Sequence, residues 1–262
     1  TGKVELVAAR LGNRTLVFPD ISGNGQWITY SKLRDDCPSS QYCSNVFRYD
    51  RQRGWTENLT TNDSEMPEYG WIIDRSLSLP PVQTSILVYS PDGTYLAAAN
   101  SDALVRVFNV QDSTEYATLE GKSNALIVSM AISPDNMWLA GVTTSEVMYI
   151  WNLQAGHLAF VLDEFTERII DAFFSPDSSQ LFIVTEDELS TWQLGEKNII
   201  RVRRILMESS QVIDADLAKA SNLLATARQD GTVWLQMLPS GRVMARLNTS
   251  ESAVYEVMFS AD

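Results

Sequence analysis

The sequence predicts an all-β fold built from a repeated four-stranded unit. A short polar stretch, each time followed by apolar residues, occurs as SPDGTYL, SPDNMWL and SPDSSQLF. Aligned on the first residue of this stretch, and with two weaker copies included, the units are marked by Ser90, Ser133, Ser175, Ala218 and Ser260. The copies are therefore 43, 42, 43 and 42 residues apart. No stretch between them shows a helical period with caps, so a repeated β unit is expected.

Each unit has the pattern of four short antiparallel strands. In one of them ALIVSMAIS, MWLAGVTT, VMYIWNL and HLAFVLDE are separated by turns rich in Asp, Asn, Ser and Gly. A unit of about 40–45 residues with four such strands is typical of a β-propeller blade, which must stack on neighbouring blades. An earlier copy at Ser22 makes six first strands. We expect at least five full blades and an incomplete terminal blade, in a ring of six or seven.

These motifs resemble the Trp-Asp (WD) repeat family. The resemblance rests on the SPDG turn, the third strands VRVFNV and VMYIWNL, and the spacing. The dipeptide that names the family keeps its Asp only at Tyr49-Asp50. With His157 as the only histidine, the family's His-Asp-Ser-Trp hydrogen-bond network cannot form, so apolar packing between blades is expected. The N-terminal copy NVFRYDRQRGWTENLT is also similar to Tol-type periplasmic propellers.

Two insertions interrupt the regular spacing, because Ser22 precedes Ser90 by 68 residues. They cover residues 31–45, between a second and a third strand, and 62–82, between a fourth strand and the next blade. Turns alternate sides in an antiparallel meander, so both insertions should decorate one face. Binding sites are commonly built on loops of a rigid scaffold. The partner-binding candidates there are Tyr42, Tyr69, Trp71 and Arg75. The alternative is that the second insertion packs on its own blade.

Three acidic residues recur in successive second-to-third turns of this same face, namely Asp102, Asp187 and Asp230. An arc of carboxylates would favour a basic partner. The alternative is that each is a turn residue, because Asp tolerates the backbone that such turns need.

The two cysteines, Cys37 and Cys43, both fall in the first insertion. Two cysteines in one exposed loop favour a local disulfide and an oxidising, extracytoplasmic compartment. The alternative is a pair of free thiols in a cytoplasmic protein.

The composition argues against several classes of function. The formal net charge of −13 disfavours nucleic acid as a partner, and no apolar run is long enough to insert in a membrane. The basic cluster at Arg201, Arg203 and Arg204 has the alternation of a strand with one solvated face. A single histidine removes most catalytic triads and metal sites, and no phosphate-binding loop is present.

We therefore expect residues 1–262 to form a single propeller domain of a longer chain, with no metal, cofactor or catalytic site. Its expected function is non-catalytic binding of a protein or peptide. The alternative is an accessory propeller that gates a hydrolase domain outside this segment, because fold alone does not settle function.

Overall fold

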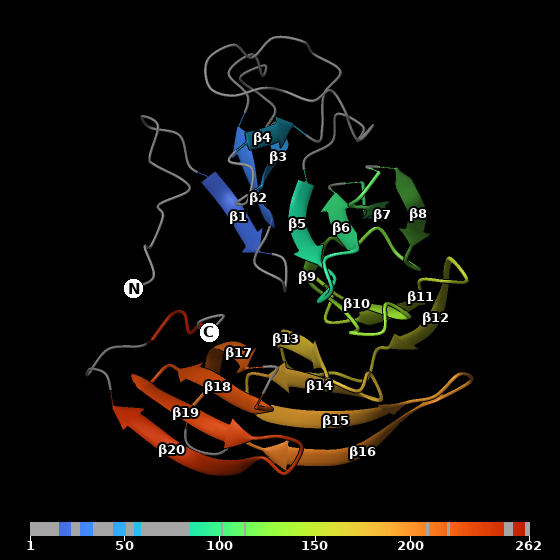
Figure 1. Cartoon of the computed structure of the whole chain (residues 1–262). Helices are drawn as coiled ribbons and strands as arrows, with labels where there is room; N and C mark the ends of the chain where they lie inside the picture. Colours follow the sequence, from blue (N-terminus) through green and yellow to red (C-terminus); the bar gives the residue numbers. More distant parts are fainter. Residues whose placement is uncertain are drawn as a thin grey trace. The chain divides into compact units, whose positions relative to one another are not determined.

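The structure is a computed structural model that describes residues 16–21, 27–33, 44–50, 55–58, 84–100, 102–112, 114–207, 210–218, 221–248 and 254–259. These residues contain twenty β-strands and no helix (Figure 1), so the all-β prediction is confirmed. The strands form five four-stranded antiparallel sheets, each made of strands consecutive in the sequence. Each sheet corresponds to one predicted blade. The chain forms two compact units, residues 1–118 and 119–262.

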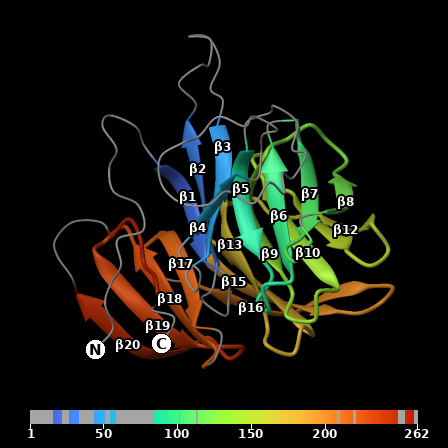
Figure 2. The same ribbon diagram turned by 45° about the horizontal axis from the view of Figure 1, so that its top comes forward.

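The first unit holds two blades, and its strands lie side by side in Figure 2. The first blade consists of β1 (Leu16–Ile21), β2 (Trp27–Leu33), β3 (Ser44–Asp50) and β4 (Trp55–Asn58). The second consists of β5 (Thr84–Tyr89), β6 (Tyr95–Asn100), β7 (Leu104–Asn109) and β8 (Glu115–Glu120), whose last two residues belong to the second unit. Long connections separate β2 from β3 and β4 from β5, where the two insertions were predicted.

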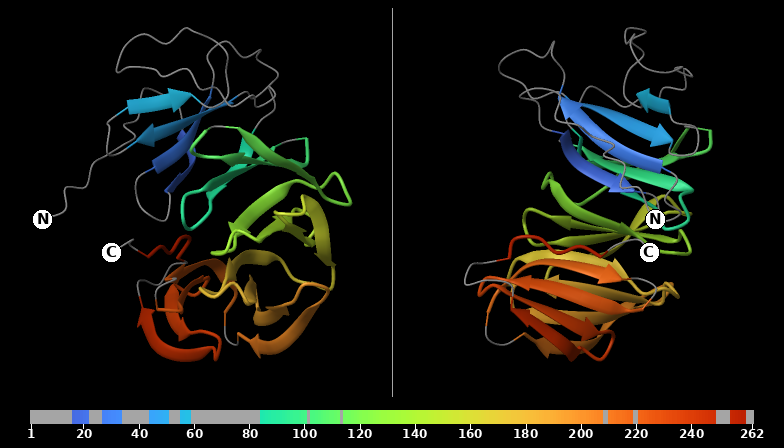
Figure 3. Two further views of the ribbon diagram at one scale, coloured as in Figure 1. Left: turned by 45° about the vertical axis from the view of Figure 1, so that its right-hand side comes forward. Right: turned by 60° about the vertical axis from the view of Figure 1, so that its left-hand side comes forward.

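The second unit holds three blades (Figure 3). The first has β9 (Ile127–Ile132), β10 (Trp138–Thr143), β11 (Met148–Asn152) and β12 (His157–Leu162). The next has β13 (Ile169–Phe174), β14 (Gln180–Thr185), β15 (Glu188–Leu194) and β16 (Ile199–Leu206). The last has β17 (Val212–Ala218), β18 (Leu223–Arg228), β19 (Thr232–Met237) and β20 (Arg242–Asn248). Within this unit the first strands of neighbouring blades contact one another, β9 with β13 and β13 with β17.

The repeated Ser-Pro-Asp stretch closes the turn between the first and second strands. In the β9–β10 turn the buried Ser133 hydroxyl donates to Asp135 Oδ1 at 2.5 Å and accepts from the Trp138 amide at 2.9 Å. The same bonds recur around Ser90 and Ser175. Three residues after the serine, each copy has a residue with positive φ: Gly93, Asn136 and Ser178. The stretch is therefore an architectural turn, built around its serine.

The core of the second unit lies between blades. One apolar cluster joins side chains of the β9–β12 and β13–β16 sheets, among them Trp138, Ile150, Leu181 and Trp192. The central strands are buried on both faces, and every residue of β10 is buried. The outer strands β16 and β20 are largely exposed. The packed core between these blades is thus apolar, as expected for a chain without the histidine network.

The segment Val254–Phe259 lies along β17, the innermost strand of the last blade, and is drawn in red beside it in Figure 1. The Val257 amide donates to Asp214 Oδ2 at 2.8 Å, and the Phe259 amide donates to Asp216 Oδ2 at 2.6 Å. The sequence predicts a first strand here. No strand is formed there, and these two amides bond to side-chain carboxylates of β17.

Candidate functional site

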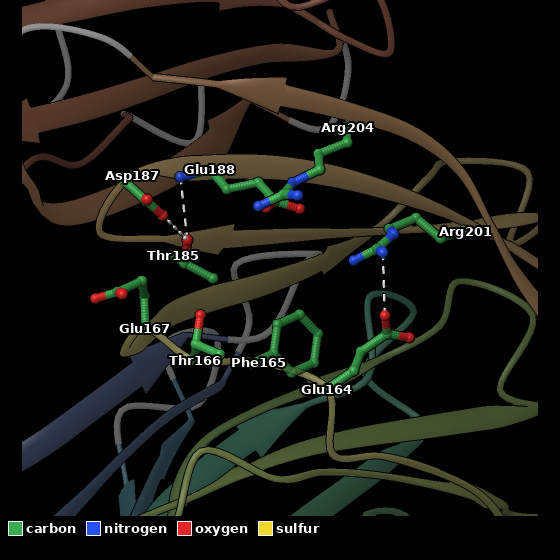
Figure 4. Close-up of a pocket in the computed structure, with 9 residues that line it drawn as sticks. All are labelled: Glu164, Phe165, Thr166, Glu167, Thr185, Asp187, Glu188, Arg201 and Arg204. Carbon is green, nitrogen blue, oxygen red and sulfur yellow. Dashed lines mark hydrogen bonds and ion pairs between the residues drawn. The ribbon is translucent and has the colours of Figure 1, made fainter.

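A pocket of about 220 Å³ opens on the second unit, on the side where second-to-third turns and fourth-to-first links emerge. Three elements form it: the link from β12 to β13, the β14–β15 turn and the outer strand β16 (Figure 4). Its lining residues are Glu164, Phe165, Thr166, Glu167, Thr185, Asp187, Glu188, Arg201 and Arg204. The predicted face thus carries a pocket in a blade without insertions.

Glu188 is the buried acid of this pocket. Its side chain is 9% exposed, at the start of β15, and its Oε2 accepts a charge-assisted hydrogen bond from Arg204 Nε at 2.5 Å. Arg204 lies on the neighbouring outer strand, and 59% of its side chain is exposed. The other carboxylate oxygen, Oε1, is buried and has no hydrogen-bond partner among the described residues. Such an atom is costly to bury, because it loses its hydration without gaining a hydrogen bond.

Arg201 closes the other side of the pocket. Its Nη2 lies 3.0 Å from Glu164 Oε2, which belongs to the β12–β13 link. Its guanidinium carbon lies 5.3 Å from the centroid of the Trp192 ring, within cation–π range. The Phe165 ring lies 6.2 Å from the same Trp192 ring, centroid to centroid. The ion pair and the aromatic contacts together fix the link beside the outer strand.

The β14–β15 turn is held by its own side chains. The Thr185 hydroxyl donates to Asp187 Oδ1 at 3.1 Å and accepts from the Glu188 amide at 3.0 Å. The Asp187 carbonyl accepts from the Met207 amide at 2.6 Å. Asp187 is therefore a turn residue that also lines the pocket, so one of the three predicted acids reaches the site.

The other two predicted acids stabilise their own turns. Asp102 Oδ1 accepts from the Leu104 amide at 3.1 Å, and its Oδ2 lies 2.9 Å from Arg106 Nη2. Asp230 accepts from the Thr232 hydroxyl at 2.7 Å and from the Thr232 amide at 3.0 Å. The hydroxyl is the main reason that the pKa of Asp230 lies below its usual value. Both acids play the turn role that was the alternative interpretation, and neither lines the pocket.

The remaining predicted site residues, Cys37, Tyr42, Cys43, Tyr69, Trp71 and Arg75, lie outside the described residues. The partner role of the insertions and the disulfide stay predictions.

Among the pocket residues that were not predicted as site residues are Glu164, Glu188, Arg201 and Arg204. The arginines were interpreted only as the solvated face of a strand, and Arg201, Arg203 and Arg204 are indeed exposed on β16. Glu188 begins strand β15, directly after the turn that holds Asp187. The register pairs Ser190 with Arg204, which sets Glu188 and Arg204 diagonally across two antiparallel strands. That register is the signal that could have revealed the pair.

Across the part of the chain that the structure describes, no group of three or more His, Cys, Asp or Glu residues could hold a metal ion. In that same part, no helix has the length and apolar character needed to cross a membrane.

Comparison with known proteins agrees with the repeat pattern. Residues 80–109 and 113–152 match the model of the WD domain, G-beta repeat. The chain is 37% identical over 67 residues to WD repeat and HMG-box DNA-binding protein 1 of Xenopus laevis, a match that covers 26% of this chain and 6% of that protein. It is 30% identical over 122 residues to small ribosomal subunit protein RACK1 of Candida albicans, covering 42% of this chain and 37% of that protein.

Among solved structures, the β-propeller domain of Cps50 (Swd1) from Myceliophteria thermophila superposes with a TM-score of 0.59 at 14% identity. The superposition covers 70% of this chain and 61% of that one. The chain spans well under half of the length of each of the two curated relatives named above. Together, the repeat match and the structural likeness show that the chain carries WD-type repeats in residues 80–109 and 113–152 and has the β-propeller fold.

Proposed function

We propose that this chain is a non-catalytic interaction module that binds a protein or peptide on the face where the second-to-third turns and fourth-to-first links emerge. The observation that carries the proposal is the pocket around Glu188. It combines a buried acceptor without a partner, an aromatic wall and two ion pairs on a rigid scaffold. Binding surfaces need such a fixed arrangement of apolar and polar groups, because ordering mobile side chains costs affinity.

The fold and the chemistry favour binding over catalysis. Propeller blades are stacked rigid sheets whose connecting loops vary independently of the core, which suits recognition. The charge of the chain favours a partner that is not a nucleic acid. We also propose that this segment is one domain of a larger protein, as with the relatives of which it spans only a part. No described feature favours the alternative of an accessory propeller for a hydrolase.

A selection experiment tests the proposal. Random peptides displayed on phage are panned against the immobilised chain, and enriched peptides are synthesised and titrated by calorimetry. Hydrogen–deuterium exchange then locates the bound peptide. We expect protection of residues 164–167 and 185–188 and none at the Ser-Pro-Asp turns, such as that of Ser133 to Trp138, on the opposite face. Failure to enrich any peptide, or protection confined to the Ser-Pro-Asp face, would contradict the proposed function.

The two aromatic residues of the second insertion are tested in parallel. A Tyr69→Ala, Trp71→Ala double variant that remains folded should bind the enriched peptides more weakly if the insertion belongs to the binding face. Unchanged affinity would show that the insertion has another role, while leaving the pocket as the binding site.

A further inference from the structure

We infer that the outer rim of the last two blades is a second docking surface, which takes an acidic segment of a partner protein that also carries apolar side chains. The surface comprises Val202 and Arg203 of β16 and Met244 and Arg246 of β20, and is called the basic rim below. All four side chains are exposed, and none of them lines the pocket around Glu188. Docking on this rim goes beyond the proposed function and is tested separately.

Positive charge is concentrated on these two outer strands. β16 and β20, of 8 and 7 residues, hold five arginines and no acid, namely Arg201, Arg203, Arg204, Arg242 and Arg246. The whole chain has only 20 Lys and Arg residues and a formal net charge of −13. The outer strand β8, by contrast, has the sequence EYATLE, with two acids and no cation. A local excess of positive charge on an acidic chain selects partners that complement the local charge.

Two arginines of the rim are available for a carboxylate partner. Arg201 and Arg204 already form ion pairs with glutamates of the pocket. Arg203 and Arg246 form no ion pair within the part of the chain that the structure describes. A partner carboxylate therefore meets them without displacing an existing pair.

The guanidinium of Arg246 is held in place before a partner arrives. Its carbon lies 3.9 Å from the centroid of the Trp234 ring, and that of the buried Arg228 lies 3.8 Å from the same centroid. Stacking restricts the exposed cation, so less side-chain freedom is lost when a carboxylate binds it. Burial, and to a lesser extent the charge of Arg246, lowers the pKa of Arg228. A carboxylate beside Arg246 would offset this repulsion between like charges.

An apolar side chain is turned outward at the same position of both strands. The pairing of β15 with β16 skips Val202, and the pairing of β19 with β20 skips Met244, one repeat later. Bulges of this kind re-aim a side chain at a sheet edge. Val202 is 54% exposed and Met244 49%. Five of the ten exposed large apolar side chains in the described residues belong to these two strands, so the apolar surface gathers where an interface would use it.

The two strands approach each other closely enough for one partner segment to contact both. A Cβ added at Gly241, directly before β20, would lie 2.3 Å from Ile205 Cδ1 of β16. Ile205 also packs against the apolar cluster between the last two blades. Figure 1 shows β16 and β20 as the outermost strands of these blades. Arginine and apolar groups of both strands therefore belong to one surface.

The setting of the rim favours an acidic protein segment over an anionic membrane. An extended anionic surface would also face the acidic remainder of the chain, whose negative charge opposes close approach. A protein segment covers the rim alone, and charges more than about 8 Å away are largely screened at physiological ionic strength. Arginine and methionine side by side are typical of protein interfaces, where apolar side chains of the partner cover the methionine.

The experiment follows peptide binding to the ¹⁵N-labelled chain by NMR. The probe is a short blocked peptide of alternating Glu and Leu, and we expect it to give saturable shifts of the amides in 200–205 and 242–247. An alternating Glu-Ser peptide keeps the charge and should bind at least about tenfold more weakly, because it lacks the apolar contacts. An alternating Lys-Leu peptide should not saturate.

Two matched double variants remove two positive charges each. Arg203→Ala with Arg246→Ala should weaken binding of the Glu-Leu peptide at least about tenfold. Lys122→Ala with Arg168→Ala, at exposed positions outside β16 and β20, should change the affinity by less than about threefold. The spectrum of each variant verifies that it is folded. If the rim variant does not fold, Arg203→Glu replaces it, with the same expected loss.

Three results would overturn docking of an acidic segment: no saturable shift at the rim, equal affinity of the folded rim variant, or equal binding of the Glu-Ser peptide. Binding of vesicles of phosphatidylcholine and phosphatidylserine without binding of the Glu-Leu peptide would assign the rim to membranes instead. Self-association that is lost in the rim variant, without peptide binding, would assign it to a second copy of this chain. None of these results affects the proposed function, which is judged by protection at residues 164–167 and 185–188.

Discussion

The Ser129 hydroxyl donates a hydrogen bond of 2.6 Å to Asp171 Oδ1, across the junction of two blades and 42 residues along the chain. One blade further, Asp214 and Asp216 accept the amides of Val257 and Phe259, each 43 residues away. At these two junctions, carboxylates of the first strands therefore join an innermost strand to the neighbouring segment. Hydrogen bonds between residues 42 or 43 positions apart arise because equivalent strands of successive repeats stack on one another.

The first prediction concerns the pH dependence of stability. Burial raises the pKa of Asp171 to about 7, and the nearby Asp214 and Asp216 carboxylates add to the rise. Between the usual Asp pKa near 4 and this value, the folded state binds more protons than the unfolded state. The contribution of Asp171 to the free energy of unfolding should therefore fall as pH rises from about 4 to about 7, by at most about 1.4 kcal/mol per pH unit.

Asp171→Asn should remove that decline, because the amide cannot ionise while its oxygen still accepts from Ser129. Urea unfolding of the unaltered chain and of the variant gives the free energy of unfolding at pH 5 and at pH 8. The difference between the values at the two pH values is then compared between the two proteins. The control is Asp163→Asn, an exposed residue after β12, which should unfold with the pH dependence of the unaltered chain. A pH dependence that survives unchanged in Asp171→Asn would show that Asp171 is not its source.

The second prediction concerns the segment Val254–Phe259. Asp216→Ala should free the Phe259 amide, and Asp214→Ala should free the Val257 amide, because each loses its carboxylate acceptor. A hydrogen bond to a charged group contributes about 1.5–3 kcal/mol, so exchange at the affected amide should accelerate about tenfold or more. Amide hydrogen exchange followed by NMR measures this directly. Unaltered exchange at both amides would mean that other contacts hold the segment.

The strands were predictable because their signals are local. The expected runs ALIVSMAIS, MWLAGVTT, VMYIWNL and HLAFVLDE coincide with β9, β10, β11 and β12 to within two residues at the ends. The turn aspartates were equally local, since Asp102 and Asp230 bond to residues two positions away. The role of Ser133 was missed, because its buried hydroxyl reaches the Trp138 amide only when the turn is closed.

The pocket could not be predicted, because it depends on contacts between elements. Glu188 and Arg204 are 16 residues apart and meet only through the β15–β16 register, which contains a shift between Thr191 and Trp192. Arg201 meets Glu164 across two blades. The charge pattern of β16 predicted a strand with one solvated face, but Ile200 and Val202 between the arginines are exposed as well. The register shift of β15 and β16 decides which arginine forms an ion pair with which acid. No alternation rule predicts such a shift.

The third prediction concerns the cysteines of the first insertion. If Cys37 and Cys43 form a disulfide, alkylation of the unfolded chain without reductant should add no mass, and alkylation after reduction should add two groups. The reason is that the short CPSSQYC loop tethers the two thiols close together. Two alkyl groups added without reductant, in protein isolated under conditions that prevent oxidation, would contradict the bridge and favour a cytoplasmic location over an extracytoplasmic one.

The fourth prediction concerns the serine of the repeated turn. Ser133→Ala removes a buried hydroxyl that both donates to Asp135 and accepts from the Trp138 amide. The free energy of unfolding should fall by about 1–3 kcal/mol, because a buried amide loses its acceptor. Ser145→Ala, at an exposed position of the β10–β11 turn, should change it by less than about 0.5 kcal/mol. Equal effects of the two substitutions in urea unfolding would refute the role assigned to Ser133.

The fifth prediction concerns Arg228, a fully buried cation at the end of β18. Its Nη1 donates to the Ser210 carbonyl at 2.7 Å, and its guanidinium carbon lies 3.8 Å from the centroid of the Trp234 ring. Burial lowers the pKa of this guanidinium, so its stacking and hydrogen bonding must compensate for the loss of water. The exposed Arg246 lies 3.9 Å from the same ring centroid, and so provides a natural comparison.

Arg228→Lys keeps the charge but loses the planar group that stacks and donates at once, so it should lower the free energy of unfolding by about 2 kcal/mol or more. Arg246→Lys should lower it by about 0.5–1 kcal/mol, because its ring contact is exposed to solvent. Urea unfolding of both variants, with Trp fluorescence as the signal, gives the comparison. Equal losses would show that the charge alone, rather than the planar guanidinium in its buried position, is what Arg228 contributes to the last blade.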